Sequence, residues 1–229
     1  MAYAPNMSDS ANKGLGNKGT GNKGTIVFQG GGAFTAHDEL DRRLLSDVKA
    51  KKVVVLPTAD AFERPEVLVA AAMSWGERLG VEVDALMVMR RVEAMETDAA
   101  HVVRKADAVW LVGDNPIHLR SVIKDTPIFD ALHHVLKEGG VVVGAGAPAS
   151  ALCDPMIDPR GGALALGLGL VTGMAVVAQA EKITPDRHAR TKKLANVPVV
   201  FLPSESALVH RRGEWEAIGP NETIGDLPA

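Results

Sequence analysis

The stretch VVVGAGAPAS, residues Val141 to Ser150, decides the fold. Its β-branched run gives way to alternating glycine and alanine. This pattern predicts a buried parallel strand over residues 141–145 that ends in a glycine-rich loop. In an open α/β sheet, ligands bind outside the carboxyl ends of the strands. We therefore expect the glycine-rich turn around Gly146 to face a ligand site.

On both sides of this stretch, short β-branched runs alternate with longer amphipathic segments, which is typical of a parallel sheet flanked by helices. The other predicted strands are residues 26–29, 53–57, 81–89, 108–112 and 199–203. The predicted helices are residues 38–50, 65–79, 97–105 and 128–138. Residues 207–219 form two β segments around a glycine turn, which predicts a C-terminal β hairpin. The sequence thus predicts an α/β three-layer sandwich with a parallel sheet.

Residues 1–24 differ from the rest in composition. They are rich in Gly, Asn, Lys and Ser, with Asn-Lys-Gly repeated at Asn12, Asn17 and Asn22. Such a segment is too polar to bury a core. We therefore predict a disordered tail over residues 1–24 and a single domain over residues 25–229.

Charge and composition exclude several classes of partner. The chain of 229 residues carries a net charge of −3, so it has no basic field for nucleic acid or an anionic membrane. It has one cysteine, Cys153, and no Cys and His cluster at metal-ligand spacing. No basic start followed by an apolar stretch opens the chain, and no apolar run is long enough to span a bilayer. We expect a cytoplasmic protein without metal or cofactor.

Two more glycine loops follow predicted strands. Gly30-Gly31-Gly32 resembles the start of a dinucleotide fingerprint, but Thr35 stands where that pattern needs glycine or alanine, so nucleotide binding is the weakest hypothesis. Gly113-Asp114-Asn115 precedes Pro116, and this order predicts that Asp114 caps a helix beginning there. Both loops are expected at the same edge of the sheet as Gly146.

Taken in order, the segments resemble the cyanophycinase and dipeptidase E family of serine peptidases, which has the class I glutamine amidotransferase-like (flavodoxin-like) fold. The resemblance runs from Thr25 to the C-terminus. It rests on Gly30-Gly31-Gly32, on residues 55–60, on residues 111–115 and on the pair of segments 167–170 and 177–180. Their order and spacing together are more specific than any one of them.

The most informative match is residues 144–157, which resemble that family's nucleophile elbow. Asp154 and the pair Met156-Ile157 fix the register. On this register Gly146 occupies the place of the nucleophilic serine and Ala180 the place of the base histidine. Glycine and alanine supply neither nucleophile nor proton acceptor. The resemblance therefore implies the fold and pocket of a serine peptidase without its two catalytic side chains.

Two residues are candidate substitutes. Ser150 lies one helical turn past Gly146, where we expect its hydroxyl to face helix packing or its own backbone instead of the pocket. His188 lies in the polar segment 182–190, where the family carries an Arg-rich stretch beside its histidine. Cys153 has an apolar context and is expected to be a buried structural thiol. The remaining histidines are interpreted as structural, on polar faces or inside helices: His37, His101, His118, His133, His134 and His210.

The expected ligand pocket lies where the glycine loops meet, and the resemblance makes Gly113 and Ala147 its backbone donors. Its members are Gly31, Gly32, Gly113, Asp114, Asn115, Gly146, Ala147 and Gln179. The first functional hypothesis is a non-catalytic relative that binds a small peptide, a carboxylate or a protein partner, as a homodimer. The alternative is an active serine-type peptidase or amidase on short acidic peptides, with a displaced nucleophile at Ser150 and His188 as base.

Overall fold

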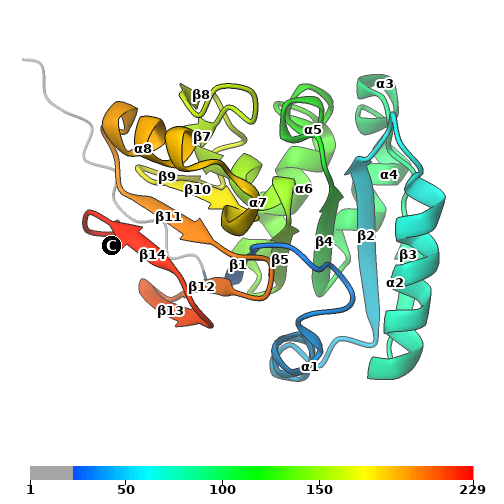
Figure 1. Cartoon of the computed structure of the whole chain (residues 1–229). Coiled ribbons are helices and arrows are strands. Elements are labelled where there is room, and N and C mark those ends of the chain that lie inside the picture. The colour runs from blue at the N-terminus through cyan, green and yellow to red at the C-terminus, as the bar shows by residue number, and fades with distance from the viewer. Residues whose placement is uncertain (1–22, 229) are drawn as a thin grey trace, which may run out of the picture.

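The computed structural model describes residues 23–228, so most of the predicted tail lies outside the described residues. Gly24, which we assigned to that tail, donates its N–H to the Leu136 carbonyl at 2.8 Å. The strand that follows lies in the middle of the molecule (Figure 1). The ordered domain therefore begins at least one residue earlier than predicted.

A seven-stranded sheet forms the centre of the molecule, with strand order β13-β12-β1-β5-β4-β2-β3. The five strands from β1 to β3 in this order run parallel, and the C-terminal hairpin β12–β13 joins antiparallel to β1, as the glycine turn predicted. The strands are β1 Thr25–Gln29, β2 Lys52–Ala59, β3 Glu82–Ala85, β4 Ala108–Gly113, β5 Val141–Ala145, β12 Ala207–Arg211 and β13 Glu214–Ile218.

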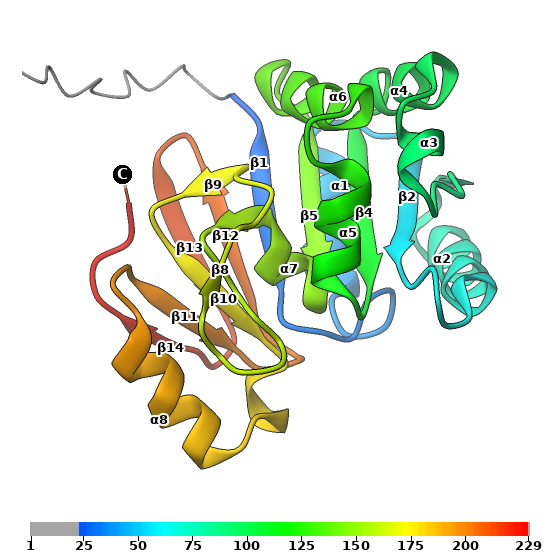
Figure 2. The same cartoon turned by 90° about the horizontal axis from the view of Figure 1, so that it is seen from above.

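Helices cover both faces of this sheet, which confirms the predicted three layers (Figure 2). Alternate residues of one strand face opposite layers: Val54 and Leu56 of β2 belong to one core cluster, and Val53 and Val55 to the other. Helices α1 Asp38–Asp47 and α2 Pro65–Leu79 cover one face. The other face carries α3 Arg91–Ala94, α4 Thr97–Arg104, α5 Pro116–Ile123, α6 Pro127–Lys137 and α7 Ala147–Leu152.

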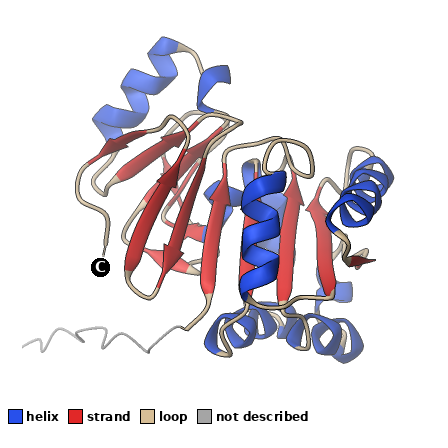
Figure 3. Cartoon of the chain, turned by 90° about the horizontal axis from the view of Figure 1, so that it is seen from below, coloured by secondary structure: helices blue, strands red, loops and turns tan. Residues whose placement is uncertain are grey.

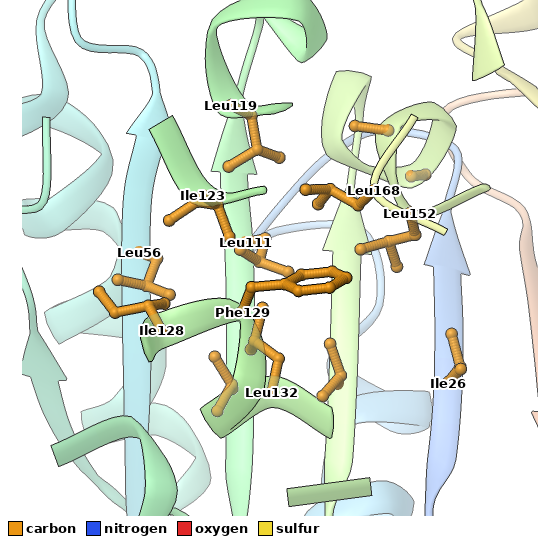
Figure 4. Packing of buried hydrophobic residues seen from close by; sticks show 14 of the residues in the cluster. Ile26, Leu56, Leu111, Leu119, Ile123, Ile128, Phe129, Leu132, Leu152 and Leu168 are labelled. Carbon is orange, nitrogen blue, oxygen red and sulfur yellow. The ribbon is translucent and has the colours of Figure 1, made fainter. Parts of the chain in front are cut away.

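The larger core cluster shows why the α4 to α7 layer is stable (Figure 4). Leu111 from β4 packs there with Ile123 from α5, Ile128 from α6 and Leu152 from α7, and all four are fully buried. Burying such a side chain contributes about 1.5–3 kcal/mol. This packing holds α7, and with it the turn that precedes α7, against the sheet.

A second, smaller sheet lies beside the first and carries helix α8 on its outer side (Figure 3). It contains β10 Ala175–Ala178, β11 Val199–Leu202 and β14 Glu222–Ile224, with α8 at Pro185–Leu194 and a 3-10 turn, η1, at Ala180–Lys182. The predicted strand 199–203 is therefore part of this sheet and not of the central one. Four two-residue strands complete the structure: β6 Cys153–Asp154, β7 Met156–Ile157, β8 Leu164–Ala165 and β9 Val171–Thr172.

Two predicted elements are too long. The strand predicted at 81–89 ends at Ala85, because β3 is an edge strand whose ladder with β2 covers four residue pairs. The helix predicted at 38–50 ends at Asp47, and Lys49 adopts a left-handed φ of 53° that cannot continue a helix. Helix α8 was not predicted, because its residues are polar on every face of the helix and apolar residues do not recur at helical spacing.

A polar network lies buried beneath the end of β1. Asp41 of α1 is fully buried, and its carboxylate accepts hydrogen bonds from Gln29 Nε2 at 2.6 Å and from Trp75 Nε1 at 3.0 Å. Burial raises the pKa of Asp41 to about 7, although both hydrogen bonds act to lower it. The folded protein therefore holds this carboxyl protonated over a pH range in which the unfolded chain ionises it.

This network makes a contribution to stability that falls as pH rises. Because the pKa of Asp41 is higher in the folded state than its ordinary value of 3.8, the contribution of this carboxyl is lost between about pH 4 and pH 7 and then stays level. Asp41→Asn removes the ionisation, so the difference in free energy of unfolding between variant and wild type should shift in the variant's favour by roughly 2–4 kcal/mol from pH 4 to pH 7. Urea unfolding at several pH values measures this difference. A wild-type stability that rises from pH 4 to pH 7 in step with the variant would contradict the prediction.

In residues 23–228 we found no helix that combines the length and the apolar character needed to cross a bilayer.

Candidate functional site

The turn from β5 into α7 has the backbone of a nucleophile elbow. Gly146 has φ 69° and ψ −131°, a conformation that few side chains tolerate. Its N–H donates to the Gln29 carbonyl at 3.0 Å, and its carbonyl accepts from the Ala149 N–H at 2.9 Å. The turn is thus fixed on one side to β1 and on the other to α7.

Open space surrounds Gly146 at the point where a side chain would begin. A Cβ atom built there would lie 3.8 Å from the Gly113 carbonyl and 3.9 Å from Gln179 Nε2, with nothing closer. At Gly30, by contrast, a Cβ would lie 1.9 Å from the Pro203 carbonyl. Close packing therefore requires glycine at residue 30, whereas only the backbone conformation favours it at residue 146.

Gln179 approaches Gly146 from the smaller sheet. It follows β10, has a left-handed φ of 52°, and donates its N–H to the Gly30 carbonyl at 2.9 Å. A residue other than glycine in this region costs about 1–2 kcal/mol, and such strain gathers at functional sites. The segment after β10 therefore presents an amide side chain to the elbow.

Three neighbouring hollows surround the elbow, and Asp114 lines all of them. The first, which we name the acidic hollow, has a volume of about 370 Å³. Its lining residues are Gly31, Gly32, Ala33, Asp60, Glu63, Arg64, Val67, Leu68, Gly113, Asp114, Ala145, Gly146 and Gln179. Three carboxylates face one guanidinium there, so its charge is negative.

The second hollow, which we name the basic hollow, has a volume of about 210 Å³ and shares Asp114 and Gln179 with the first. It is lined by Asp114, Pro116, Ala147, Ser150, Ile157, Pro159, Val177, Ala178, Gln179, Lys182, Ile183 and Arg187. The third, the rim hollow, has a volume of about 300 Å³ and is lined by Ala59, Phe62, Glu63, Asp114, Asn115, Pro116, Ile117, Pro159 and Arg160. The three hollows lie side by side, because neighbouring hollows share lining residues, and we refer to them together as the cleft.

The surroundings of Asp60 in the acidic hollow disfavour its ionised form. The pKa of Asp60 is raised, first by burial and then by the negative charges of Asp114 and Glu63. Backbone N–H groups of Arg64 and Asp114 donate to Asp60 and partly offset this effect. A cation placed among these groups would favour the ionised form of Asp60.

The residues predicted for the pocket come together in this cleft. Six of them line the acidic hollow, Ala147 lines the basic hollow and Asn115 lines the rim hollow. One assigned role was wrong. Asn115, and not Asp114, caps helix α5, because Asn115 Oδ1 accepts the His118 N–H at 2.9 Å. Asp114 is therefore free to face the cleft.

Ser150 and His188 make separate contacts. Ser150 is buried, its Oγ accepts the Ile157 N–H at 3.3 Å, and its side chain also lines the basic hollow, which we had not expected. His188 Nε2 lies 2.7 Å from the Glu222 carboxylate, and its ring packs on Phe201 with centroids 4.3 Å apart. The hydrogen bonds of these two residues do not join them.

Ala180 packs against the core of the smaller sheet, with Val177 and Phe201, and is not among the residues that line the three hollows. Its neighbour Gln179 is the residue of this segment nearest to a Cβ at Gly146. None of the residues lining the three hollows is a histidine.

His37 is not on a polar face as predicted. It is 5% exposed, and Nε2 donates to the carbonyl oxygens of Gly31 at 3.0 Å and Ser204 at 3.2 Å. Burial lowers the pKa of His37, so the neutral ring ties the first glycine loop to the loop after β11. His210 is half-buried against Trp215. Cys153 is buried as expected, and burial raises the pKa of its thiol.

Apart from Asp114, sequence reasoning missed the charged residues of the cleft. Asp60, Glu63 and Arg64 follow β2, and Lys182 and Arg187 belong to η1 and α8. The first group carried a usable signal, because it stands at the carboxyl end of a parallel strand next to the Gly113 strand. The second group carried none, because the sequence did not reveal that a smaller sheet brings it beside the elbow.

The mainly parallel sheet, its two helical layers and the elbow between β5 and α7 define a flavodoxin-like α/β protein of the class I glutamine amidotransferase type. The model of Peptidase family S51 matches residues 26–216, and the chain belongs to that family. This confirms the resemblance to cyanophycinase and dipeptidase E. A comparison with curated proteins found no match.

Two solved structures share the fold. A peptidase from an acI-B1 Actinobacterium aligns with a TM-score of 0.78 and 22% identity, over 89% of this chain and 95% of that one. A candidate peptidase E from Listeria monocytogenes EGD-e aligns with a TM-score of 0.65 and 20% identity, over 85% of this chain and 97% of that one. The fold therefore extends over nearly the whole length of both relatives.

The different causes of glycine at residues 30 and 146 predict different costs of substitution. Gly146→Ala should lower the free energy of unfolding by about 1–2 kcal/mol, since only the backbone conformation is strained. Gly30→Ala should cost more, about 3 kcal/mol or above, because its Cβ would collide with the backbone of Pro203. Urea denaturation of both variants tests this, and an equal or reversed order would show that space at residue 146 is not open.

Proposed function

We propose that this chain is a non-catalytic member of Peptidase family S51 that binds a small peptide or carboxylate ligand in the cleft around Gly146. The observation that carries the proposal is an elbow turn whose nucleophile position is a glycine with open space above it. A nucleophile elbow works by presenting a hydroxyl or thiol at this position. Glycine presents neither, while the surrounding turn keeps its shape.

The lack of a positioned base supports the same proposal. The side chain nearest the open position is the Gln179 amide, which does not accept a proton at neutral pH. His188 is engaged by Glu222, and His37 uses Nε2 to hold two carbonyl groups. A nucleophilic mechanism needs the nucleophile and base within hydrogen-bond reach of each other.

Binding groups, in contrast, are retained. Within the described part of the chain, the N–H groups of Gly31, Gly32 and Ala147 donate to no other residue, and all three residues line the cleft. Free backbone donors in a concave site bind carbonyl and carboxylate oxygens. A ligand with such oxygens, as every peptide has, suits these donors.

A displaced nucleophile is the second candidate. Ser150 is the hydroxyl residue that lines the basic hollow, and this position favours it over other serines. Its Oγ already accepts the Ile157 N–H, and no histidine lines that hollow. The hydroxyl would therefore act without the base that a serine peptidase uses.

Peptide hydrolysis distinguishes the two candidates. Wild-type protein and Ser150→Ala, at high protein concentration, should both fail to cleave a panel of short peptides that includes aspartyl dipeptides and β-aspartyl-arginine. Product formation followed by liquid chromatography measures this. Turnover by the wild type that disappears in Ser150→Ala would overturn the non-catalytic proposal and make Ser150 the nucleophile. The variant's thermal unfolding should be recorded as well, since loss of the bond to Ile157 costs about 1 kcal/mol by itself.

Homodimer formation, a protein partner and a cytoplasmic location stay predictions. The buried, lone Cys153 suits a reducing compartment. Size-exclusion chromatography with light scattering would test the dimer directly.

A further inference from the structure

Charges of opposite sign occupy opposite ends of the cleft. On the β2 side, Asp60, Glu63 and Asp114 outnumber Arg64. On the side of the smaller sheet, Lys182 and Arg187 line the basic hollow. The elbow lies between them, because Gly146 lines the first hollow and its neighbour Ala147 the second.

None of these charged side chains is held in an ion pair. The described residues form ten ion pairs, yet none of the ten includes a charged side chain of the acidic or the basic hollow. Charged residues elsewhere on the surface do pair, as Arg43 does with Glu216 and Arg211 with Asp47. A ligand in the cleft therefore has no ion pair to break before it contacts these side chains.

An exposed aromatic ring stands next to the acidic hollow. Phe62 is 75% exposed, and its ring meets His118 edge-on with centroids 4.6 Å apart. It lines the rim hollow together with Glu63 and Asp114, which also line the acidic hollow. Carboxylates beside an aromatic face attract organic cations, through charge and through the ring quadrupole.

We propose that the cleft selects a dipolar ligand, which places an ammonium or guanidinium group among Asp60, Glu63 and Phe62 and a carboxylate beside Lys182 and Arg187. This inference rests on the proposed function and adds a polarity to it: the ligand must carry a cation at one end and a carboxylate at the other. The ligand's backbone would cross the elbow, where the open position at Gly146 leaves room for it.

An organic cation fits the acidic hollow better than a metal ion. Among residues 23–228, no group of three His, Cys, Asp or Glu side chains is arranged to hold a metal. Asp60 also directs its carboxylate toward backbone N–H groups of Arg64 and Asp114. A larger cation with several N–H donors can reach carboxylates that are too far apart to share one ion.

Peptides of matched size test the polarity. The probes are Ala-Ala-Ala, its N-acetyl form, its C-terminal amide and N-acetyl-Lys-Ala-Ala, titrated at low ionic strength into the wild-type chain and followed by protein NMR shifts. Acetylation and amidation should each weaken binding roughly three- to tenfold. N-acetyl-Lys-Ala-Ala shows which cation of a peptide the acidic hollow binds. If this peptide binds more tightly than N-acetyl-Ala-Ala-Ala, the hollow binds a cationic side chain. If it binds no more tightly, the hollow binds the terminal ammonium.

Variants locate each charge. Glu63→Gln should lower the affinity for Ala-Ala-Ala about threefold and leave the affinity for the N-acetyl peptide unchanged. Lys182→Gln should lower the affinity for Ala-Ala-Ala and leave the affinity for its C-terminal amide unchanged. Both residues are exposed, so neither change disturbs the core. Glu66→Gln and Lys193→Gln are the matched controls, since both residues are exposed and neither lines a hollow of the cleft.

The peptide titrations distinguish a failure of the polarity from a failure of the proposed function. Equal affinity for the free and the N-acetyl peptide would overturn the polarity and leave peptide binding in place. If no probe binds, the proposed function is overturned, and the inference with it. Equal losses of affinity for Ala-Ala-Ala in Glu63→Gln and Glu66→Gln would also reject the polarity. They would show that the ligand responds to the overall negative charge of this surface and not to a contact with Glu63.

Discussion

The hydrogen bonds at the end of β1 hold the two sheets and the elbow together. Gln29 accepts the Gly146 N–H, and the next carbonyl, that of Gly30, accepts the Gln179 N–H. Two consecutive carbonyl groups thus connect β1 to the turn after β5 and to the segment after β10. The cleft exists because these three chain segments end at the same place, and Gly30 must lack a side chain for the loop after β11 to close beside them.

The buried network under β1 supports this junction from below. Asp41, which Trp75 holds by a hydrogen bond, accepts from the side chain of the same Gln29 whose carbonyl accepts the Gly146 N–H. His37 fixes the opposite side by bridging Gly31 and Ser204. Neutral side chains suit such a position, since burial disfavours charge on both Asp41 and His37. Both groups beneath the cleft are therefore shifted toward their neutral forms, whereas charged side chains line the cleft itself.

The central sheet could be predicted from sequence, because its strands are buried β-branched runs and its hairpin has a glycine turn. The elbow could be located by the same reasoning, and its conformation agrees. The smaller sheet was missed, because β10 is a short apolar strand and α8 is polar throughout. That part of the chain supplies Lys182 and Arg187 to the basic hollow, so these two charged residues could not be placed before the structure was known.

The turn at Gly146 keeps its shape through contacts that do not involve a side chain at that position. The turn is held by Gln29 and by α7, whose Ala149, Ala151 and Leu152 are fully buried, and none of these contacts uses a side chain at residue 146. A side chain at this position would carry strain of about 1–2 kcal/mol, which glycine avoids. In the non-catalytic member that we propose, no hydroxyl is needed there, so glycine suits the turn. The hollows around it are built from backbone and from flanking charged side chains, and they do not depend on a side chain at residue 146.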